Sequence, residues 1–493
     1  MGQTILDWFA YCLVMIMLLC FTGDEPACGL IPSTTMKLYF EAEKFVKEGD
    51  RGLKNRIFNA KLSNSPKHVY ALVISTLKYK EYIEEILRKS KIQQLPEIKK
   101  LKMKDLLLML MIHDFLFSAK GRIQLGKHPM KEAFLLNKTR LQAELTKLKL
   151  KHKVTSVEKL PLKEGIDEDE TPVRWIRINT IKINSEQFFK KHLFFSQLEP
   201  VSSIAEITQP GVIYHDEHIQ NLYGLHPREK ITSTPAYLQG EIIIQDRASC
   251  FPAEILNNDP NDVHLEVIDA CAAPGNKTTH AASFVGPKGV VYAFERDNRR
   301  VKVLKTMCEK ATGKAKKSLI HPTHADFTTI APSDFPSVTG MIVDPSCSGS
   351  GIFGRAIEDA NSQEQAREEI DTERLNKLAG FQFKIMKHAL SFPKVHKVVY
   401  STCSIHPHEN ERVVVDLLSD AEIQKQGWKL EKRQFVIPSW ERRGWEQEFS
   451  SLCDGDKEKC LEMAGGCVRS VPKEDGGIGF FAACFVRAPV KDQ

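Results

Sequence analysis

The sequence of 493 residues has twelve cysteines but no CxxC pair. A chain of this length can bury a sizeable core and needs no disulfide framework, so free thiols in a reducing compartment are expected. Cys453, Cys460 and Cys467 recur every seven residues, but no histidines stand at a spacing that would complete a zinc site. We therefore expect no bound metal.

The segment before Met36 has no basic residue and three acidic residues. Within this extension, residues 1–35, an apolar run from Ile5 to Phe21 is interrupted only by Asp7. The run is long enough for a signal-peptide core or a marginal membrane span, but it lacks the positive start of a signal. It is therefore a targeting or anchor segment, a packed helix, or the product of a mis-assigned translation start at which Met36 is the true beginning. We favour the last and expect no stable membrane association.

The net charge of +6 conceals an asymmetry along the chain. Residues 36–160 hold 28 Lys and Arg against 13 Asp and Glu, whereas the chain from Pro161 onward holds 41 against 47. The amino-terminal part is therefore predicted to meet a polyanion. A solvated, lysine-rich helical surface is the plainer alternative.

Apolar residues at three-and-four spacing predict a helical domain over residues 36–155. The pattern is clear in Val69 to Leu87 and in Met103 to Phe117. In Leu141 to Lys153 the polar face becomes almost wholly positive, which indicates an element that contacts RNA.

An acidic run at 166–170 and Pro172 mark a linker, and the pattern that follows predicts a small α+β module over residues 156–240. From 241 to 493, short β-branched runs alternate with helical segments. This alternation favours an α/β fold with a doubly wound, Rossmann-like sheet of parallel strands. Ligands of such folds bind beyond the carboxyl ends of the strands, so the residues after each run are the candidates for chemistry.

Three successive strand ends carry the groups that an adenosyl ligand needs. The first ends in a loop of small residues, DACAAPGNK at 269–277, which has neither the GxGxxG nor the GxxxxGK[ST] spacing of phosphate-binding loops. The second ends at Glu295, which can accept hydrogen bonds from a ribose diol, with Arg300 further along. The third ends at Asp326, which can accept from an adenine amino group. A pocket without a phosphate loop indicates S-adenosylmethionine.

Two cysteines follow the next two strands, Cys347 in DPSCSGSG and Cys403 in STCS. Carbon 5 of a cytosine is a poor nucleophile until a thiolate adds at carbon 6, so a cysteine at this place favours cytosine methylation over amine methylation. Asp344 is placed to hold or protonate ring nitrogen 3. The spacing does not show which thiol attacks, and two small buried core cysteines remain the plainer alternative.

The sequence resembles the NSUN, or Sun-domain, family of RNA cytosine-5 methyltransferases in DACAAPGNKT, DPSCSGSG, YSTCS with HENE after it, RINT and QDRASC. The resemblance covers the chain from about Met36 to the end. It implies Cys403 as the nucleophile and Cys347 as the residue that assists release. The cofactor contacts that it implies are Cys271, Ala272, Ala273, Pro274, Gly275, Asn276, Lys277, Glu295, Arg300, Asp326 and Asp344.

Two departures from the family pattern are visible: Glu295 stands for the more usual aspartate, and DPSC for the commoner PPC form. QDRASC and DPSCSGSG are similar to the subgroup that acts on large-subunit ribosomal RNA. Because that subgroup begins with a sequence similar to MKLYFEAEKFV, Met36 is the expected start. A nuclear and nucleolar monomer, acting on RNA and in contact with pre-ribosomal particles, is the corresponding expectation.

The resemblance also implies that residues 177–182 and 245–250 form the junction between the RNA-binding module and the catalytic sheet. RINT could equally be an ordinary edge strand. Glu409 and Asn410 either orient the Cys403 loop or only cap the following helix. A non-catalytic RNA-binding ribosome-assembly factor on a methyltransferase fold is the alternative function, and a secreted or membrane-attached protein is a third.

Overall fold

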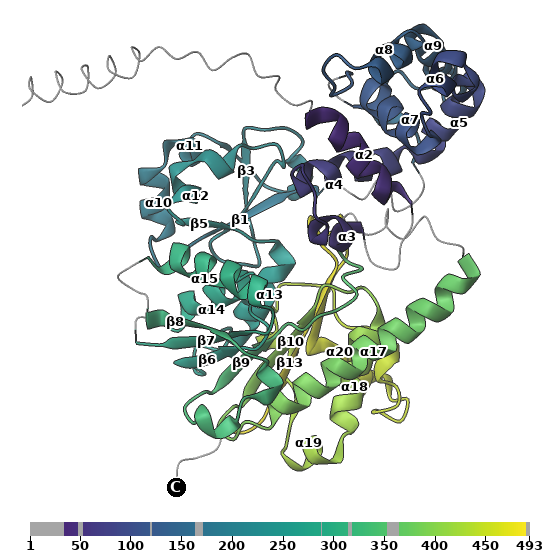
Figure 1. The fold of residues 1–493 in the computed structure, drawn as a ribbon. Helices are drawn as coiled ribbons and strands as arrows, with labels where there is room; N and C mark the ends of the chain where they lie inside the picture. Colours follow the sequence, from purple (N-terminus) through teal and green to yellow (C-terminus); the bar gives the residue numbers. More distant parts are fainter. Residues whose placement is uncertain are drawn as a thin grey trace, which may run out of the picture. The chain divides into compact units, whose positions relative to one another are not determined.

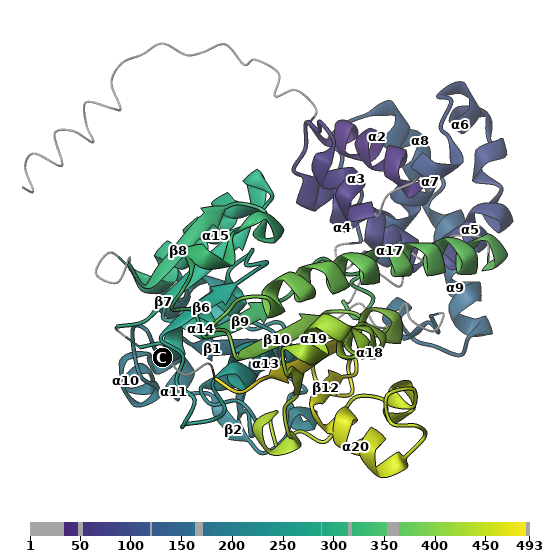
Figure 2. The same cartoon turned by 90° about the horizontal axis from the view of Figure 1, so that it is seen from below.

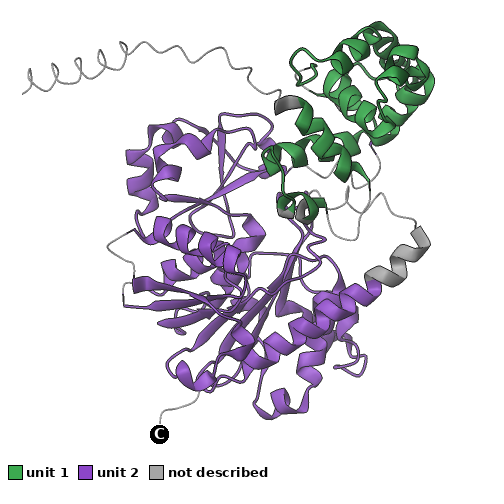
Figure 3. Ribbon diagram, in the orientation of Figure 1, with its two compact units in different colours: residues 1–161 green, residues 162–493 purple. Residues whose placement is uncertain are grey.

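The computed structural model describes residues 34–47, 53–118, 121–162, 171–286, 288–313, 318–352 and 364–489 (Figure 1). The apolar run from Ile5 to Phe21 lies outside the described residues. The chain forms two compact units, residues 1–161 and 162–493 (Figure 3). In the part of the chain that the structure describes, no helix combines the length and apolar character needed to cross a bilayer.

The first unit is helical, in agreement with the fold expected from the apolar spacing. Helix α7 is its centre, because six successive residues from Leu107 to Ile112 are buried. The segment from Val69 to Leu87 is helical as expected, and it is divided between two helices that meet at Tyr79. The helices of this unit are α2 (Thr34–Val46), α3 (Leu53–Asn59), α4 (Pro66–Lys78), α5 (Lys80–Ser90), α6 (Pro96–Lys100), α7 (Asp105–Ile112), α8 (Pro129–Leu135) and α9 (Lys138–Lys151).

Helix α9 has one narrow apolar stripe and is otherwise polar. Leu141, Leu145 and Leu148 are buried at a spacing of four and three residues, which places them on one face of the helix. Lys147 and Lys151 are exposed and pair with single glutamates, Glu144 and Glu85. Surface pairs of this kind contribute little to stability, so the positive charge of this face remains available to a polyanion.

The second unit contains a small α+β module built on a sheet of order β2-β3-β4-β1-β5. Strand β1 carries the RIN segment and lies between β4 and β5, so the edge-strand interpretation is wrong. Strand β5 extends the module's sheet to Ile244, beyond the boundary expected at residue 240. The elements are β1 (Arg174–Ile178), α10 (Ser185–Lys191), α11 (Leu193–Ser196), β2 (Glu199–Val201), β3 (Val212–His215), β4 (Leu222–Leu225), α12 (Pro235–Leu238) and β5 (Ile242–Ile244).

The larger sheet of this unit has the order β11-β13-β10-β9-β6-β7-β8, with β12 paired to β13. Each expected strand run forms a strand. The strands are β6 (Glu266–Asp269), β7 (Val290–Glu295), β8 (Ile320–His324), β9 (Gly340–Val343), β10 (Lys397–Thr402), β11 (Lys429–Leu430), β12 (Cys467–Ser470) and β13 (Phe480–Val486).

The expectation of a wholly parallel sheet is wrong at one edge. Strands β6 to β10 pair in parallel, but β13 is antiparallel to β10. Strand β13 is also antiparallel to β12, which it follows after nine residues without a helix, because a short connection without a crossover joins antiparallel strands.

Helices cover both faces of this sheet (Figures 1 and 2). On the first face lie α13 (Arg247–Leu256), α14 (Asn276–Phe284) and α15 (Asn298–Thr312), and on the second lie α17 (Glu364–Leu390), α18 (Glu411–Ser419), α19 (Ala421–Lys425) and α20 (Lys457–Gly465). Successive strand residues point to opposite faces, so Val267 packs against the first of these groups and Ile268 against the second.

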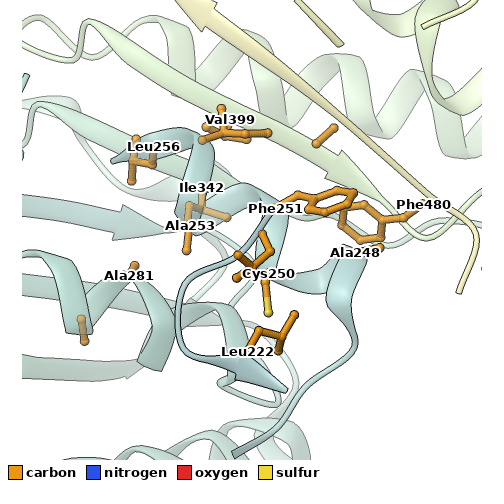
Figure 4. Packing of buried hydrophobic residues seen from close by; sticks show 14 of the residues in the cluster. Leu222, Ala248, Cys250, Phe251, Ala253, Leu256, Ala281, Ile342, Val399 and Phe480 are labelled. Carbon is orange, nitrogen blue, oxygen red and sulfur yellow. The ribbon is translucent and has the colours of Figure 1, made fainter. Parts of the chain in front are cut away.

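Helix α13 is the main packing element of the first face. Figure 4 shows its side chains against Ile342 of β9 and Val399 of β10, with Ala281 of α14 and Leu222 of the module nearby. One core thus joins the module to the catalytic sheet.

Strand order reverses between β6 and β9, which are neighbours in the sheet although β7 and β8 separate them in the chain. In open α/β sheets the crevice at such a reversal, at the carboxyl ends of the strands, is where ligands bind. The candidate site is therefore expected beyond Asp269 and Val343.

At the opposite ends of these strands Asp262, His264 and His396 lie together, the one group within the described residues whose ligand atoms could share a metal ion. The Lys397 ammonium lies 3.9 Å from the Asp262 carboxylate and supplies the positive charge of the group. Burial lowers the pKa of His264 to about 4, so its imidazole is neutral at pH 7. We interpret the cluster as a buried ionic network.

Candidate active site

The loop after β6 turns sharply at Gly275, whose φ of +113° is a conformation that glycine adopts readily and other residues do not. A Cβ added there would meet Leu304 and Met307 at 3.2 Å. Beneath the loop, Thr278 Oγ1 donates to Asp269 Oδ2 at 2.6 Å, whereas Asp269 Oδ1 is buried without a partner. Burial raises the pKa of Asp269 to about 6. The loop therefore presents a close backbone and an unsatisfied acceptor at the strand end.

A cavity of about 250 Å³ opens beyond the carboxyl ends of β6, β7, β8 and β9. It brings together many of the residues expected from the sequence: Cys271, Ala273, Glu295, Arg300, Asp326, Asp344, Cys347 and Cys403. Other residues of the glycine loop do not line it: Ala272, Pro274, Gly275, Asn276 and Lys277. The individual cofactor contacts stay predictions.

Two carboxylates stand in this cavity at the ends of neighbouring strands. Glu295 is almost fully buried and lies 3.3 Å from Arg300, whose guanidinium also donates to the carbonyl of Ala273. Asp326 accepts from the amide and hydroxyl of Thr328, and these bonds, led by the hydroxyl, lower the pKa of Asp326. Both groups can accept hydrogen bonds at neutral pH, as a ribose diol and an adenine amino group require.

Asp344 is held by two hydrogen-bond donors at the end of β9. Lys277 Nζ donates to its Oδ2 at 2.8 Å and to Ser249 Oγ at 3.0 Å, while Ser401 Oγ donates to Oδ1 at 2.7 Å. Burial by itself would lower the pKa of Lys277. The charge of Asp344, the hydrogen bond to Asp344 and then the charge of Cys403 outweigh burial, so the pKa of Lys277 is raised. Lys277 is therefore a permanent positive charge between the carboxylate and the thiol.

The two cysteine sulfurs lie 3.2 Å apart at the ends of the adjacent strands β9 and β10. Both thiols are half-buried in irregular segments at the cavity wall, which is contrary to the alternative of core cysteines. The hydrogen bond to Cys403, burial, the charge of Cys403 and then that of Asp344 raise the pKa of Cys347. These surroundings therefore disfavour the thiolate form of Cys347.

Backbone and hydroxyl bonds join the two cysteine loops. The amide of Gly351 donates to the carbonyl of Cys403 at 3.0 Å. Ser348, Ser350 and Ser404 form a triangle of hydroxyls with separations of 3.1 to 3.2 Å. The two loops are therefore hydrogen-bonded to each other close to the two sulfurs.

Two lining residues had no signal in the sequence. Phe381 and Ile385 reach the cavity from α17, where the sequence shows only ordinary helix residues. Ser249 and Ser401, which lie within QDRASC and STCS, contact the Lys277–Asp344 pair from outside the lining. Arg296 was findable, because it follows Glu295 directly at a strand end. The junction expected at 177–182 and 245–250 carries a direct bond, from Arg177 Nε to Gln245 Oε1 at 3.0 Å.

An adenosyl-type cavity on a doubly wound sheet, with two thiols at its wall, defines an α/β methyltransferase that acts through a cysteine. Residues 253–486 match the family model described as 16S rRNA methyltransferase RsmB/F. Residues 67–160 match that of the NOL1/NOP2/Sun domain family member 5, N-terminal domain. The chain belongs to the Sun-domain family of RNA cytosine-5 methyltransferases.

Two curated relatives support this assignment over most of their length. The chain is 40% identical to the 25S rRNA (cytosine-C(5))-methyltransferase rcm1 of Schizosaccharomyces pombe, over 87% of this chain and 86% of that protein. It is 30% identical to the 28S rRNA (cytosine-C(5))-methyltransferase of Mus musculus, over 90% and 89%. These relatives favour the enzyme over the alternative of a non-catalytic assembly factor.

A solved structure supports the fold. The crystal structure of PH0851 has a TM-score of 0.54 and 19% identity and covers 93% of this chain and 99% of its own. The expected α/β methyltransferase fold is thus confirmed. S-adenosylmethionine is the cofactor that this family uses, as the adenosyl pattern of the sequence predicted.

Proposed function

We propose that this chain methylates carbon 5 of a cytosine in large-subunit ribosomal RNA, with Cys403 as the nucleophile. The names of the two relatives above support the substrate, since each acts on a large-subunit rRNA. The observation that carries the chemistry is the pair of sulfurs 3.2 Å apart, beside Asp344, at the wall of the cavity.

In the first step the Cys403 thiolate adds to carbon 6 of the cytosine. The new S–C6 bond pushes the electrons of the 5,6 double bond toward carbon 5, while negative charge spreads over the ring to nitrogen 3 and the carbonyl. Asp344 holds or protonates nitrogen 3, and Ser401 and Lys277 keep its carboxylate in place.

The surroundings favour Cys403 over Cys347 as the attacking thiol. The hydrogen bond to Cys403 and burial raise the pKa of Cys347 most, and the carboxylates of Asp344 and Glu409 further disfavour its thiolate. Lys277 is positively charged and interacts electrostatically with Cys403. A thiolate next to an ammonium is stabilised, and this is the ground for assigning the attack to Cys403.

S-adenosylmethionine, when bound, supplies the methyl group to carbon 5 from its sulfonium. Glu295 would hold the ribose and Asp326 the adenine, since both carboxylates line the cavity. Phe381 and Ile385 add an apolar wall. The pocket thereby orients the donor toward the side on which the cysteines stand.

Release requires loss of the carbon-5 proton and of the Cys403 sulfur. Once Cys403 is bonded to carbon 6, Cys347 loses both the hydrogen bond to that thiol, which is the largest cause of its raised pKa, and the smaller effect of the Cys403 charge. Cys347 can then give its proton to water and, as a thiolate, accept the proton from carbon 5. The 5,6 double bond re-forms and Cys403 leaves as a thiolate.

Three further assignments belong to the same proposal. The basic helical unit, residues 36–155, binds the RNA backbone, residues 156–240 form the connecting module, and residues 241–493 catalyse the transfer. A rRNA-modifying role favours a nuclear, nucleolar location and contact with pre-ribosomal particles. The protein acts as a monomer.

Bisulfite sequencing of total RNA, with and without the protein, tests both modification type and substrate. We expect one protected cytosine in large-subunit rRNA that disappears without the protein and is restored by the wild type but not by Cys403→Ala. The Cys347→Ala variant is expected to remain bonded to its RNA on a denaturing gel. Normal turnover by Cys347→Ala without such an adduct would contradict the assigned roles.

A further inference from the structure

Two consecutive residues, Glu409 and Asn410, carry buried polar side chains directly behind the cysteine loops. Both are fully buried, at 0% exposure. Glu409 ends the short helical turn Pro407–Glu409, and Asn410 precedes α18. Asn410 makes no side-chain capping bond to α18, which excludes the interpretation that it only caps that helix.

Glu409 holds the two peptide groups on either side of Cys347. Its Oε1 accepts from the amide of Ser348 at 2.8 Å and from Gln382 Nε2 at 3.0 Å. The same Nε2 group donates to the carbonyl of Ser346 at 3.1 Å. The residue before Cys347 and the residue after it are therefore tied to one buried pair of side chains.

Asn410 does the same for Cys403. Its Oδ1 accepts from Thr402 Oγ1 at 2.6 Å, and its Nδ2 donates to the carbonyl of Ser404 at 2.9 Å. Thr402 and Ser404 are the two neighbours of Cys403 in the chain. One asparagine thus restrains the nucleophile loop from both sides.

The Glu409 clamp is reinforced from the sheet. Tyr400 donates to Gln382 Oε1 at 3.2 Å and to the Glu409 carbonyl, and it is fully buried on β10. Glu409 Oε2 remains without a partner in this buried place. Burying a carboxylate is costly, so an apolar residue would have been the more stable choice if packing were the only requirement.

We propose that Glu409 and Asn410 are separate positioning residues, Glu409 for Cys347 and Asn410 for Cys403. This division rests on the proposed function, because it follows from the roles given to the two thiols. A displacement of about 1 Å at a reacting group can cost about 100-fold in rate. Loss of each clamp should therefore impair only the step of the thiol that it holds.

Two RNA probes separate the steps. A transcript of the target rRNA segment that contains 5-fluorocytidine reports attack and methyl transfer without release. Fluorine would have to leave carbon 5 without its bonding electrons, which it cannot do, so the methylated adduct is trapped. The same transcript with ordinary cytidine reports release, through the fraction of protein that stays bonded to RNA. Both are read on denaturing gels in single-turnover reactions with S-adenosylmethionine.

We expect Glu409→Ala to form the fluorinated adduct at a rate within about threefold of the wild type. With ordinary RNA it should accumulate at least about tenfold more adduct. Asn410→Ala should form the fluorinated adduct about 10- to 100-fold more slowly and accumulate none with ordinary RNA. Glu409→Gln and Tyr400→Phe change few atoms and should show the defect of Glu409→Ala in weaker form. These two variants keep the test open if Glu409→Ala does not fold.

Cofactor affinity by calorimetry and the melting temperature are measured for each variant. If both clamp variants slow attack equally, or if their defects follow lost stability, the division of roles is wrong. If the wild type formed no fluorinated adduct, or if the Cys403→Ala variant formed it equally well, the proposed function itself would be overturned. That outcome is recognisable before any clamp variant is compared.

Discussion

Lys277 and Asp344 form a 2.8 Å ion pair across the point where the strand order reverses, one from the loop after β6 and the other from the end of β9. Both side chains are mostly buried. The pair places a positive charge beside Cys403 and leaves the carboxylate oriented by Ser401. It connects the cofactor loop directly to the site of attack on the base.

Lys277→Met should remove the charge that favours the Cys403 thiolate. We expect the single-turnover methylation rate at saturating S-adenosylmethionine to fall about 100-fold, with cofactor affinity within about threefold of the wild type. Lys302→Met, on the exposed face of α15, is the matched control and should behave as the wild type. A normal rate with weakened cofactor binding would instead make Lys277 a cofactor contact, as the family resemblance implies.

Asp326→Asn should weaken cofactor binding, because the amide cannot replace both carboxylate oxygens. A lost charge-assisted hydrogen bond costs about 1.5 to 3 kcal/mol, so the Kd measured by calorimetry should rise about 10-fold or more. Thr328→Val removes the hydroxyl that bonds Asp326 without changing the carboxylate. That control should change the affinity far less, and an equal loss in both variants would show that loop order matters rather than the carboxylate.

Gly275→Ala should destabilise the cofactor loop. The positive φ costs about 1 to 3 kcal/mol for a residue with a side chain, and the added methyl meets Leu304 and Met307 at 3.2 Å. Gly380→Ala is the contrasting variant, since nothing lies within 4 Å of its Cβ position in α17. Urea denaturation should show the first variant less stable and the second more stable by about 0.5 to 1 kcal/mol.

Glu254 should make stability depend on pH. Burial raises its pKa from 4.5 to about 7, with Arg177 opposing and Asp216 adding to the shift, and His280 lies 3.3 Å away. Since the folded state holds this proton more tightly, its contribution is complete below pH 4.5 and is lost as the pH rises through 7. Relative to Glu254→Gln, the wild type should lose about 3 kcal/mol between pH 4.5 and 8 in urea titrations. The opposite slope would contradict the assignment.

The basic face of α9 should bind RNA through phosphates. Lys147→Glu with Lys151→Glu is expected to weaken RNA binding and to reduce the salt dependence of log Kd by about 2, at unchanged cofactor affinity. Leu141, Leu145 and Leu148 stay in place, so the helix should keep its packing. The alternative of a merely solvated surface predicts no change in affinity or in salt slope.

Local sequence patterns predicted much of the candidate site. Glu295 and Asp344 each end an apolar run and Asp326 follows a further strand, and strand ends of a parallel sheet meet at one edge, so proximity followed from the fold class. The reversed strand β13 was not foreseeable, because an apolar run has no direction. Helix α17 supplies Phe381 and Ile385 to the cavity, but its periodicity shows only that some face is buried.

By itself the sequence determined the kind of chemistry, because side-chain identity decides which atoms can act as nucleophile, acid or acceptor. Only the tertiary structure decided which charged groups surround the two similar thiols. Lys277, Asp344 and Glu409 act on the sulfurs from three separate segments. Electrostatic influence falls with distance through space, and spacing along a chain does not report that distance.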